Sequence, residues 1–178
     1  MLWSIAFSQI GVVMSDLYFL DPNGPADPDG AERGVRLELR HFERASPKGS
    51  VYAAIPISIG SPIWRVDLLE TVTSEPGSLN RAHHHPRLHN WEPGARKFVE
   101  ALSNDPLRWV HDRFDDIETV LVEAGYIIDD LDPGDIEGLR RSGTMIETML
   151  KHLLTEVHEG RAGLAPETSG VGARVSWL

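Results

Sequence analysis

Hydrophobic and polar positions alternate with a period of two residues through the middle of the chain, as is typical of strands. The run 35–40 places its apolar residues on one face of a strand, and the alternation puts His41 on the same, inward face. The odd positions of run 51–59 share a face, and Pro56 within it indicates an edge strand or a bulge. After a turn at 60–62, a third run, 64–72, alternates Trp64, Val66 and Leu68 with Arg65 and Asp67. The short turns between these runs predict an antiparallel meander.

The apolar period changes to 3.6 residues in the second half of the chain. It predicts helices over 93–102, 107–124 and roughly 133–160, the last weakened at Gly143. Gly125 is a natural residue to end the second helix. The apolar stripe from Ile146 to Val157 should pack on the sheet, whereas exposure of that stripe would indicate a homodimer formed through this helix.

Strands followed by helices predict an α+β fold, in which a small N-terminal antiparallel β-sheet packs against C-terminal α-helices. Residues 35–160 form the expected single domain, and 161–178 a flexible tail. Residues 1–34 are expected to hold an N-terminal strand or extension and a loop rich in Pro, Gly and Asp. Met14 is an alternative start, so two readings of residues 1–13 stay open: an extra strand, or a segment outside the native protein.

The amino-acid composition and net charge exclude several classes of protein and of functional site. The 178 residues carry 27 acidic and 17 basic side chains, a net charge of −10, which argues against extended nucleic-acid binding. The absence of cysteine excludes disulfides, thiolate metal sites and a cysteine nucleophile. No basic residue precedes Arg33 and no run approaches the ~18 apolar residues of a membrane span, so we expect a cytoplasmic protein with no membrane partner. The excess of arginine over lysine, 14 to 3, indicates a bacterial origin.

Half of the eight histidines fall between Arg81 and His89. In an extended chain, His83 and His85 point to the same side as Arg81, and His84 points away. Imidazole nitrogens that converge in this way suit Zn, Fe, Mn, Ni or Cu. The sequence therefore predicts a divalent transition metal held by His83, His85 and His89, with Glu92 or His41 as an additional ligand.

The same segment resembles the first metal motif of the cupin family. Gly77, the paired His83 and His85, and His89 in place of the motif's glutamate follow its spacing over about thirteen residues. The resemblance implies two histidines and a third ligand on one metal. It stops there, because no second motif follows and helices are expected where a cupin continues its barrel. We therefore interpret it as convergent ligand geometry and not as membership of the family.

Basic residues accompany the histidines and leave two functional alternatives open. Residues 81–97 carry a net charge of +3 in an acidic chain, so Arg81, Arg87 and Trp91 are candidates for binding a small anionic molecule. Without a metal, the histidines and arginines would suit a phosphodiesterase or an RNase-like enzyme of the toxin type.

A third class of function is a non-catalytic interaction or regulatory protein. Residues 111–159 carry 13 acids against 4 bases, which such a protein would use toward a basic partner.

Overall fold

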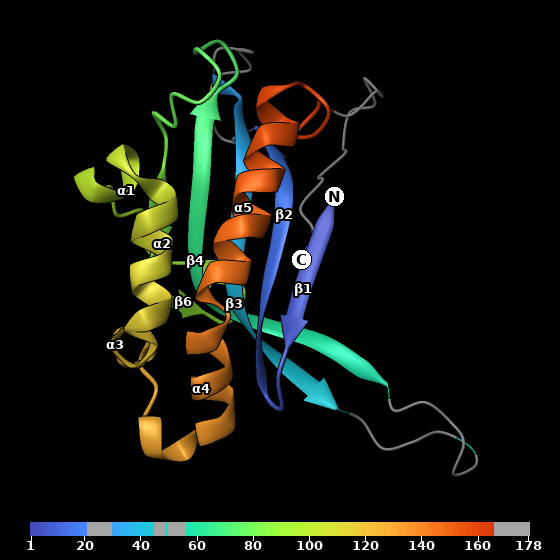
Figure 1. The fold of residues 1–178 in the computed structure, drawn as a ribbon, viewed down its shortest axis with the longest axis vertical. Helices are drawn as coiled ribbons and strands as arrows, with labels where there is room; N and C mark the ends of the chain where they lie inside the picture. Colours follow the sequence, from blue (N-terminus) through green and yellow to red (C-terminus); the bar gives the residue numbers. More distant parts are fainter. Residues whose placement is uncertain (21–29, 45–48, 50–55, 166–178) are drawn as a thin grey trace.

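Five antiparallel strands form one sheet in the order β1-β2-β3-β4-β5, and Figure 1 shows β1 to β4 side by side. The structure is a computed structural model and describes residues 1–20, 30–44, 49 and 56–165. The strands are β1 (Leu2–Ala6), β2 (Ile10–Phe19), β3 (Glu32–Arg44), β4 (Ile57–Thr71) and β5 (His83–His85). A separate two-stranded hairpin joins β6 (Leu88–His89) to β7 (Glu92–Pro93). Helices follow the strands in sequence, so the predicted α+β class is confirmed.

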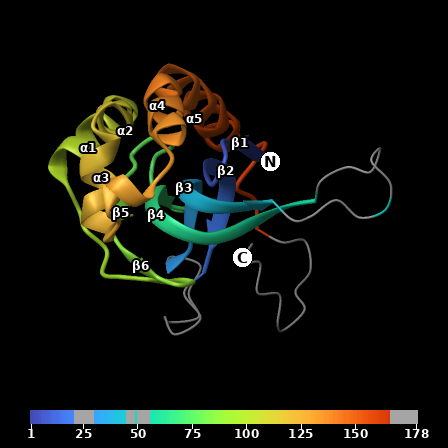
Figure 2. The ribbon, with the colours of Figure 1, turned by 90° about the horizontal axis from the view of Figure 1, so that it is seen from below.

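The helices cover one face of the sheet, while the β6 segment passes on its other side (Figure 2). They are α1 (Glu100–Asn104), α2 (Pro106–Asp115), α3 (Ile117–Ala124), the short 3-10 helix η2 (Ile128–Asp130), α4 (Pro133–Arg141) and α5 (Gly143–His158). None of the helices in the described part of the chain has the length and apolar character needed to cross a membrane.

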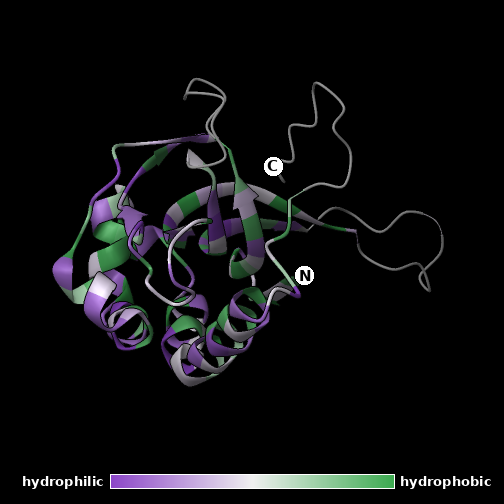
Figure 3. Ribbon diagram, turned by 90° about the horizontal axis from the view of Figure 1, so that it is seen from above, coloured by the Kyte–Doolittle hydropathy of each residue, from purple (hydrophilic) through white to green (hydrophobic). Residues whose placement is uncertain are grey.

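The core lies between the helices and the inward positions of β2, β3 and β4. Hydropathy alternates along these strands, and the inward positions form one buried cluster with the helices (Figure 3). The stripe of α5 is buried against β2 and β3 as predicted. Trp64 of β4 is 1% exposed, and its ring lies 6.1 Å from that of Trp109 and 6.4 Å from that of Phe114 on α2.

Three helix predictions need correction. The predicted helix 133–160 is divided at Ser142 into α4 and α5, next to the Gly143 at which it was expected to weaken. The predicted helix 107–124 is broken at Asp116 into α2 and α3, although one apolar stripe continues through both. The predicted helix 93–102 begins only at Glu100. Lys97 exchanges two backbone hydrogen bonds with His84, of 2.9 and 3.0 Å, and this bridge keeps the preceding residues extended. Phe98, an apolar residue of that predicted helix, is 59% exposed.

The turn predicted at 60–62 is also wrong, because these residues lie inside β4. Pro62 faces Arg40 of β3 at a shift in strand register, which accommodates a residue that has no N–H to donate. Residues 51–55 of the neighbouring predicted strand lie outside the described residues. At the N-terminus, the segment left open as a strand or an extension forms β1 and the start of β2.

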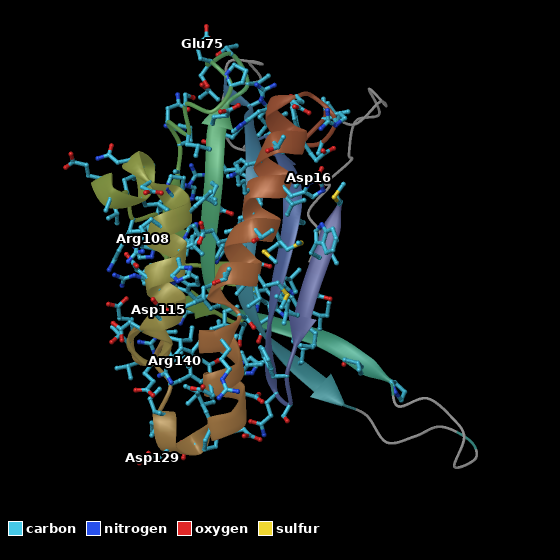
Figure 4. The ribbon with its side chains drawn as sticks, viewed as in Figure 1. Asp16, Glu75, Arg108, Asp115, Asp129 and Arg140 are labelled. Atoms are coloured by element: carbon cyan, nitrogen blue, oxygen red, sulfur yellow. The ribbon has the colours of Figure 1, made fainter. Side chains whose placement is uncertain are left out.

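A buried carboxylate connects the β1–β2 turn to α4. Asp135 is 2% exposed and accepts hydrogen bonds from the backbone N–H groups of Ser8 (2.8 Å), Gln9 (2.7 Å) and Ile10 (3.0 Å). Arg140 of α4, which Figure 4 labels, donates to Glu118 of α3 at 3.2 Å. These contacts fix α4 to both the sheet and its neighbouring helix.

Candidate metal centre

The pairing of β4 with β5 determines which histidines meet. Asp67 lies opposite His83 in the register, and Arg65 lies opposite His85. Because side chains alternate along a strand, all four point to the face away from the helices, and His84 points toward them. The ring of His84 accordingly lies 5.1 Å from that of Trp109 on α2.

The chain that follows β5 covers this polar face of the sheet. Gly94 contributes its carbonyl oxygen to His85, and the Phe98 ring lies 5.4 Å from that of His83. The exposed fractions are consequently 2% for Asp67, 1% for His83 and 4% for His85. An antiparallel sheet often leaves its second face in water, whereas here that face encloses a small polar interior.

Asp67, His83 and His85 bring three potential ligand atoms together. Oδ2 of Asp67 lies 3.5 Å from Nε2 of His83 and 3.7 Å from Nε2 of His85, and the three atoms all lie within 4.8 Å of one another. These separations exceed a normal N–H···O hydrogen bond. Nε2 of His83 is buried and has no hydrogen-bond partner among the described residues.

Backbone carbonyls orient both imidazoles. Nδ1 of His83 lies 2.7 Å from the carbonyl oxygen of Arg81, and Nδ1 of His85 lies 2.7 Å from that of Gly94. A carbonyl can only accept, so each Nδ1 carries the proton and each neutral ring keeps its lone pair on Nε2. Histidines that bind a metal through one ring nitrogen usually donate the N–H of the other to a carbonyl or carboxylate in this way.

The protonation states suit a metal. Burial lowers the pKa of His83 and of His85, although Asp67 and the carbonyl contacts oppose the shift. Burial alone would raise the pKa of Asp67, but the charge and hydrogen bonds of Arg36 and the charge of Arg65 outweigh it, so that pKa is lowered. Two neutral imidazoles and one carboxylate therefore face each other near neutral pH.

Arginines surround this group on the same face. Arg36 binds Asp67 with two hydrogen bonds, of 2.7 and 3.2 Å, while Arg65 and Arg40 each lie 2.7 Å from Glu38. Glu32 accepts from Arg81 at 2.8 Å and from Arg96 at 3.3 Å. Among the described residues, five arginines and three carboxylates are paired on this face, an excess of two positive charges. Of these groups, all three carboxylates and the two arginines Arg40 and Arg65 are buried, and because buried charges are costly, their concentration here indicates a function beyond stability.

The structure separates the other residues that the sequence proposed for this site. His89 and Glu92 face each other across the exposed β6–β7 hairpin, outside the group of three ligands. His41 lies on the helix side of β3, where Nε2 is 2.5 Å from the hydroxyl of Tyr126. Asp67, and not His89, is therefore the third candidate ligand beside His83 and His85.

The three residues that the sequence proposed for anion binding do not lie together in the structure. Arg81 is paired with Glu32 beside the ligands, and Trp91 lies against Arg40, whose guanidinium carbon is 5.3 Å from the centre of its ring. Arg87 lies with His89 in a separate pocket.

The sequence did not reveal Asp67 as a candidate ligand, although its pattern placed Asp67 on the correct face of the strand. The pattern already placed Arg65 and Asp67 opposite the apolar residues of their strand, and His83 and His85 on one face of theirs. The pairing of these two strands across the loop 72–82 was the missing information.

Comparison with known proteins found no match for this chain: no protein-family model, no curated protein and no solved structure matches it.

Proposed function

We propose that this protein binds a zinc ion through Asp67, His83 and His85 and holds a small anion on that metal. The observation that supports the proposal is the tautomer of the two histidines. Both Nδ1 atoms are hydrogen-bonded to backbone carbonyls, so both Nε2 lone pairs meet a carboxylate oxygen in a closed interior. Without a cation, three acceptors would face each other there, which is electrostatically unfavourable.

The spacing of the donor atoms favours zinc among the candidate metals. An ion about 2.0–2.1 Å from each donor would subtend angles of roughly 113–135° across the 3.5 and 3.7 Å separations. The lower end of this range is near the tetrahedral angle of a four-coordinate ion. Octahedral Mn, Fe or Ni sites need angles near 90°, and hence donor atoms about 3.0 Å apart.

The charge of the surroundings indicates what completes the coordination. Three protein ligands leave a fourth position, as in zinc sites that bind water or substrate. The five arginines exceed the three carboxylates already, and a dication adds two further positive charges. An anionic fourth ligand, such as hydroxide, a carboxylate or a phosphate, would offset part of this excess.

The metal-free phosphodiesterase is less well supported by the same residues. General acid–base catalysis needs imidazoles that exchange protons with a bound substrate near neutral pH. His83 and His85 are 1% and 4% exposed, burial lowers the pKa of both, and each uses Nδ1 on a backbone carbonyl. These properties suit ligands better than proton carriers.

Metal titration of ligand variants tests the proposal. Protein without a histidine tag is stripped with EDTA, and its zinc affinity is measured by competition with a chromophoric chelator. We expect one equivalent of zinc in the wild type and an affinity at least about 100-fold lower in His83→Gln and in His85→Gln, since each loses one of three ligands. Circular dichroism establishes that each variant is folded.

His89→Gln is the matched control, because His89 belongs to the same histidine segment but lies outside the group of three ligands. Its zinc affinity should equal that of the wild type. Less than a tenth of an equivalent of zinc in the wild type, or an equal loss of affinity in His89→Gln, would reject the proposed ligand set.

A further inference from the structure

A second polar pocket, of about 430 Å³, lies between the start of β4, the β6 segment and the end of α3. It forms because β5 pairs only with Arg65–Asp67, after which the chain turns away at Pro86. The stretch Ser61–Ile63 of β4 therefore forms part of the pocket wall and not part of the β4–β5 ladder. The volume is within the range of pockets that bind small metabolites.

Arg87 supplies a positive charge to this pocket and packs against a glycine. Gly125 ends α3 with φ +97°, and a Cβ atom there would lie 2.7 Å from Nη2 and 3.0 Å from Cζ of Arg87. Glycine thus provides both the left-handed turn and the room for the guanidinium. Among the described residues, Arg87 forms no ion pair and its side chain forms no hydrogen bond, so its N–H donors are available to a ligand.

Other hydrogen-bonding groups line the same space. Tyr126 and His41 share the 2.5 Å hydrogen bond on the helix side, and burial raises the pKa of Tyr126, which keeps the phenol protonated. The β6 segment adds His89, and β4 adds the hydroxyl of Ser61. No Asp or Glu of the described residues lines the pocket, although the chain has 27 acidic residues.

We infer that this pocket binds a small phosphate monoester, with Arg87 on the phosphate. The guanidinium offers a planar pair of N–H donors to two phosphate oxygens. Ser61, His89 and Tyr126 add hydrogen-bonding groups from three further segments of the chain, and this number of polar groups suits the three terminal oxygens of a phosphate monoester better than the two oxygens of a carboxylate. The remaining volume accommodates the organic part of the ester.

This inference goes beyond the proposed zinc centre and does not depend on it. None of the zinc ligands lines the pocket, and His41, which does, lies on the opposite face of the sheet from them. Binding of the phosphate ester should accordingly persist in protein stripped of metal.

Isothermal titration with glycerol 3-phosphate tests the inference on the EDTA-treated, folded full chain. We expect saturable binding to the wild type and an affinity at least about tenfold weaker in Arg87→Gln, because a charge-assisted pair of hydrogen bonds is lost. Tyr126→Phe should weaken binding by a smaller factor. Arg108→Gln is the control, since Arg108 lies on α2, pairs with Asp112 and does not line the pocket (Figure 4).

A second measurement keeps the test decisive if a variant fails to fold. In amide NMR spectra of the wild type, glycerol 3-phosphate should shift signals of residues 61–63, 87–90 and 124–126, while lactate at the same concentration should shift them at least tenfold less. Absence of binding at millimolar concentrations, equal binding of lactate, or unchanged affinity in Arg87→Gln would overturn the inference.

Discussion

Removal of the Asp135 carboxylate should destabilise the fold strongly, although the residue lies outside both proposed sites. Its two oxygens accept three backbone N–H groups of the β1–β2 turn at 2.7–3.0 Å, and the side chain is 2% exposed. A hydrogen bond to a charged group contributes about 1.5–3 kcal/mol. Asp135→Ala leaves all three donors without this acceptor, and because such losses are not additive we expect a decrease of about 3–5 kcal/mol in the free energy of unfolding.

Asp135→Asn has a smaller expected effect, about 2 kcal/mol, because the amide retains one oxygen to accept from Gln9 and Ile10. Urea denaturation, followed by tryptophan fluorescence and circular dichroism, measures both changes. Asp129→Ala is the matched control, because Asp129 is exposed on η2 and its side chain makes no hydrogen bond within the described residues (Figure 4). A loss below about 1 kcal/mol in Asp135→Ala, or an equal loss in Asp129→Ala, would refute the role of this carboxylate.

Two further predictions concern pH and backbone packing. Burial and the charges of Lys97 and Arg113 lower the pKa of His84 to about 4. The unfolded chain therefore binds this proton first, and stability should fall by up to about 3 kcal/mol as the pH drops from about 6.5 to about 4. His84→Phe should lose less stability than the wild type over that interval in urea titrations, and identical pH profiles would contradict the assignment. Gly34→Ala should lower the free energy of unfolding by at least about 3 kcal/mol, because the added Cβ would collide with the carbonyl oxygen of Leu68. A melting temperature within a degree of that of the wild type would exclude this collision.

The strand pattern predicted the faces of the sheet well because a period of two is a local property. Val35, Leu37 and Leu39 point to the helices, and Arg65 and Asp67 point away, as the alternation indicates. The turn at 60–62 was misread because proline and glycine usually interrupt a strand. Here a register shift between β3 and β4 lets Pro62 remain inside the strand.

Helix boundaries were harder to predict because long-range contacts decide them. The apolar stripe that includes Phe114 and Leu121 is buried as predicted, yet the spacing of its residues does not reveal the break in the helix at Asp116. Phe98 fits a helical apolar pattern, but the bridge between His84 and Lys97 keeps its segment extended. Tertiary hydrogen bonds override local propensity at both places.

The candidate site was only half visible in the sequence. The alternation of side chains along a strand predicted that His83 and His85 share a face, because they are two residues apart in one strand. Asp67 comes from another strand, and only the pairing of β4 with β5 brings it opposite His83. His89 is nearer in sequence, but the β6–β7 hairpin carries it away from the ligands.

Anomalous X-ray diffraction at the zinc edge, on crystals of the reconstituted protein, tests the central proposal most directly. The proposal predicts one strong peak about 2.0–2.2 Å from Nε2 of His83, Nε2 of His85 and a carboxylate oxygen of Asp67, with an oxygen ligand in the fourth position. An anomalous peak at His89 or at other surface histidines, with none between these three residues, would contradict it.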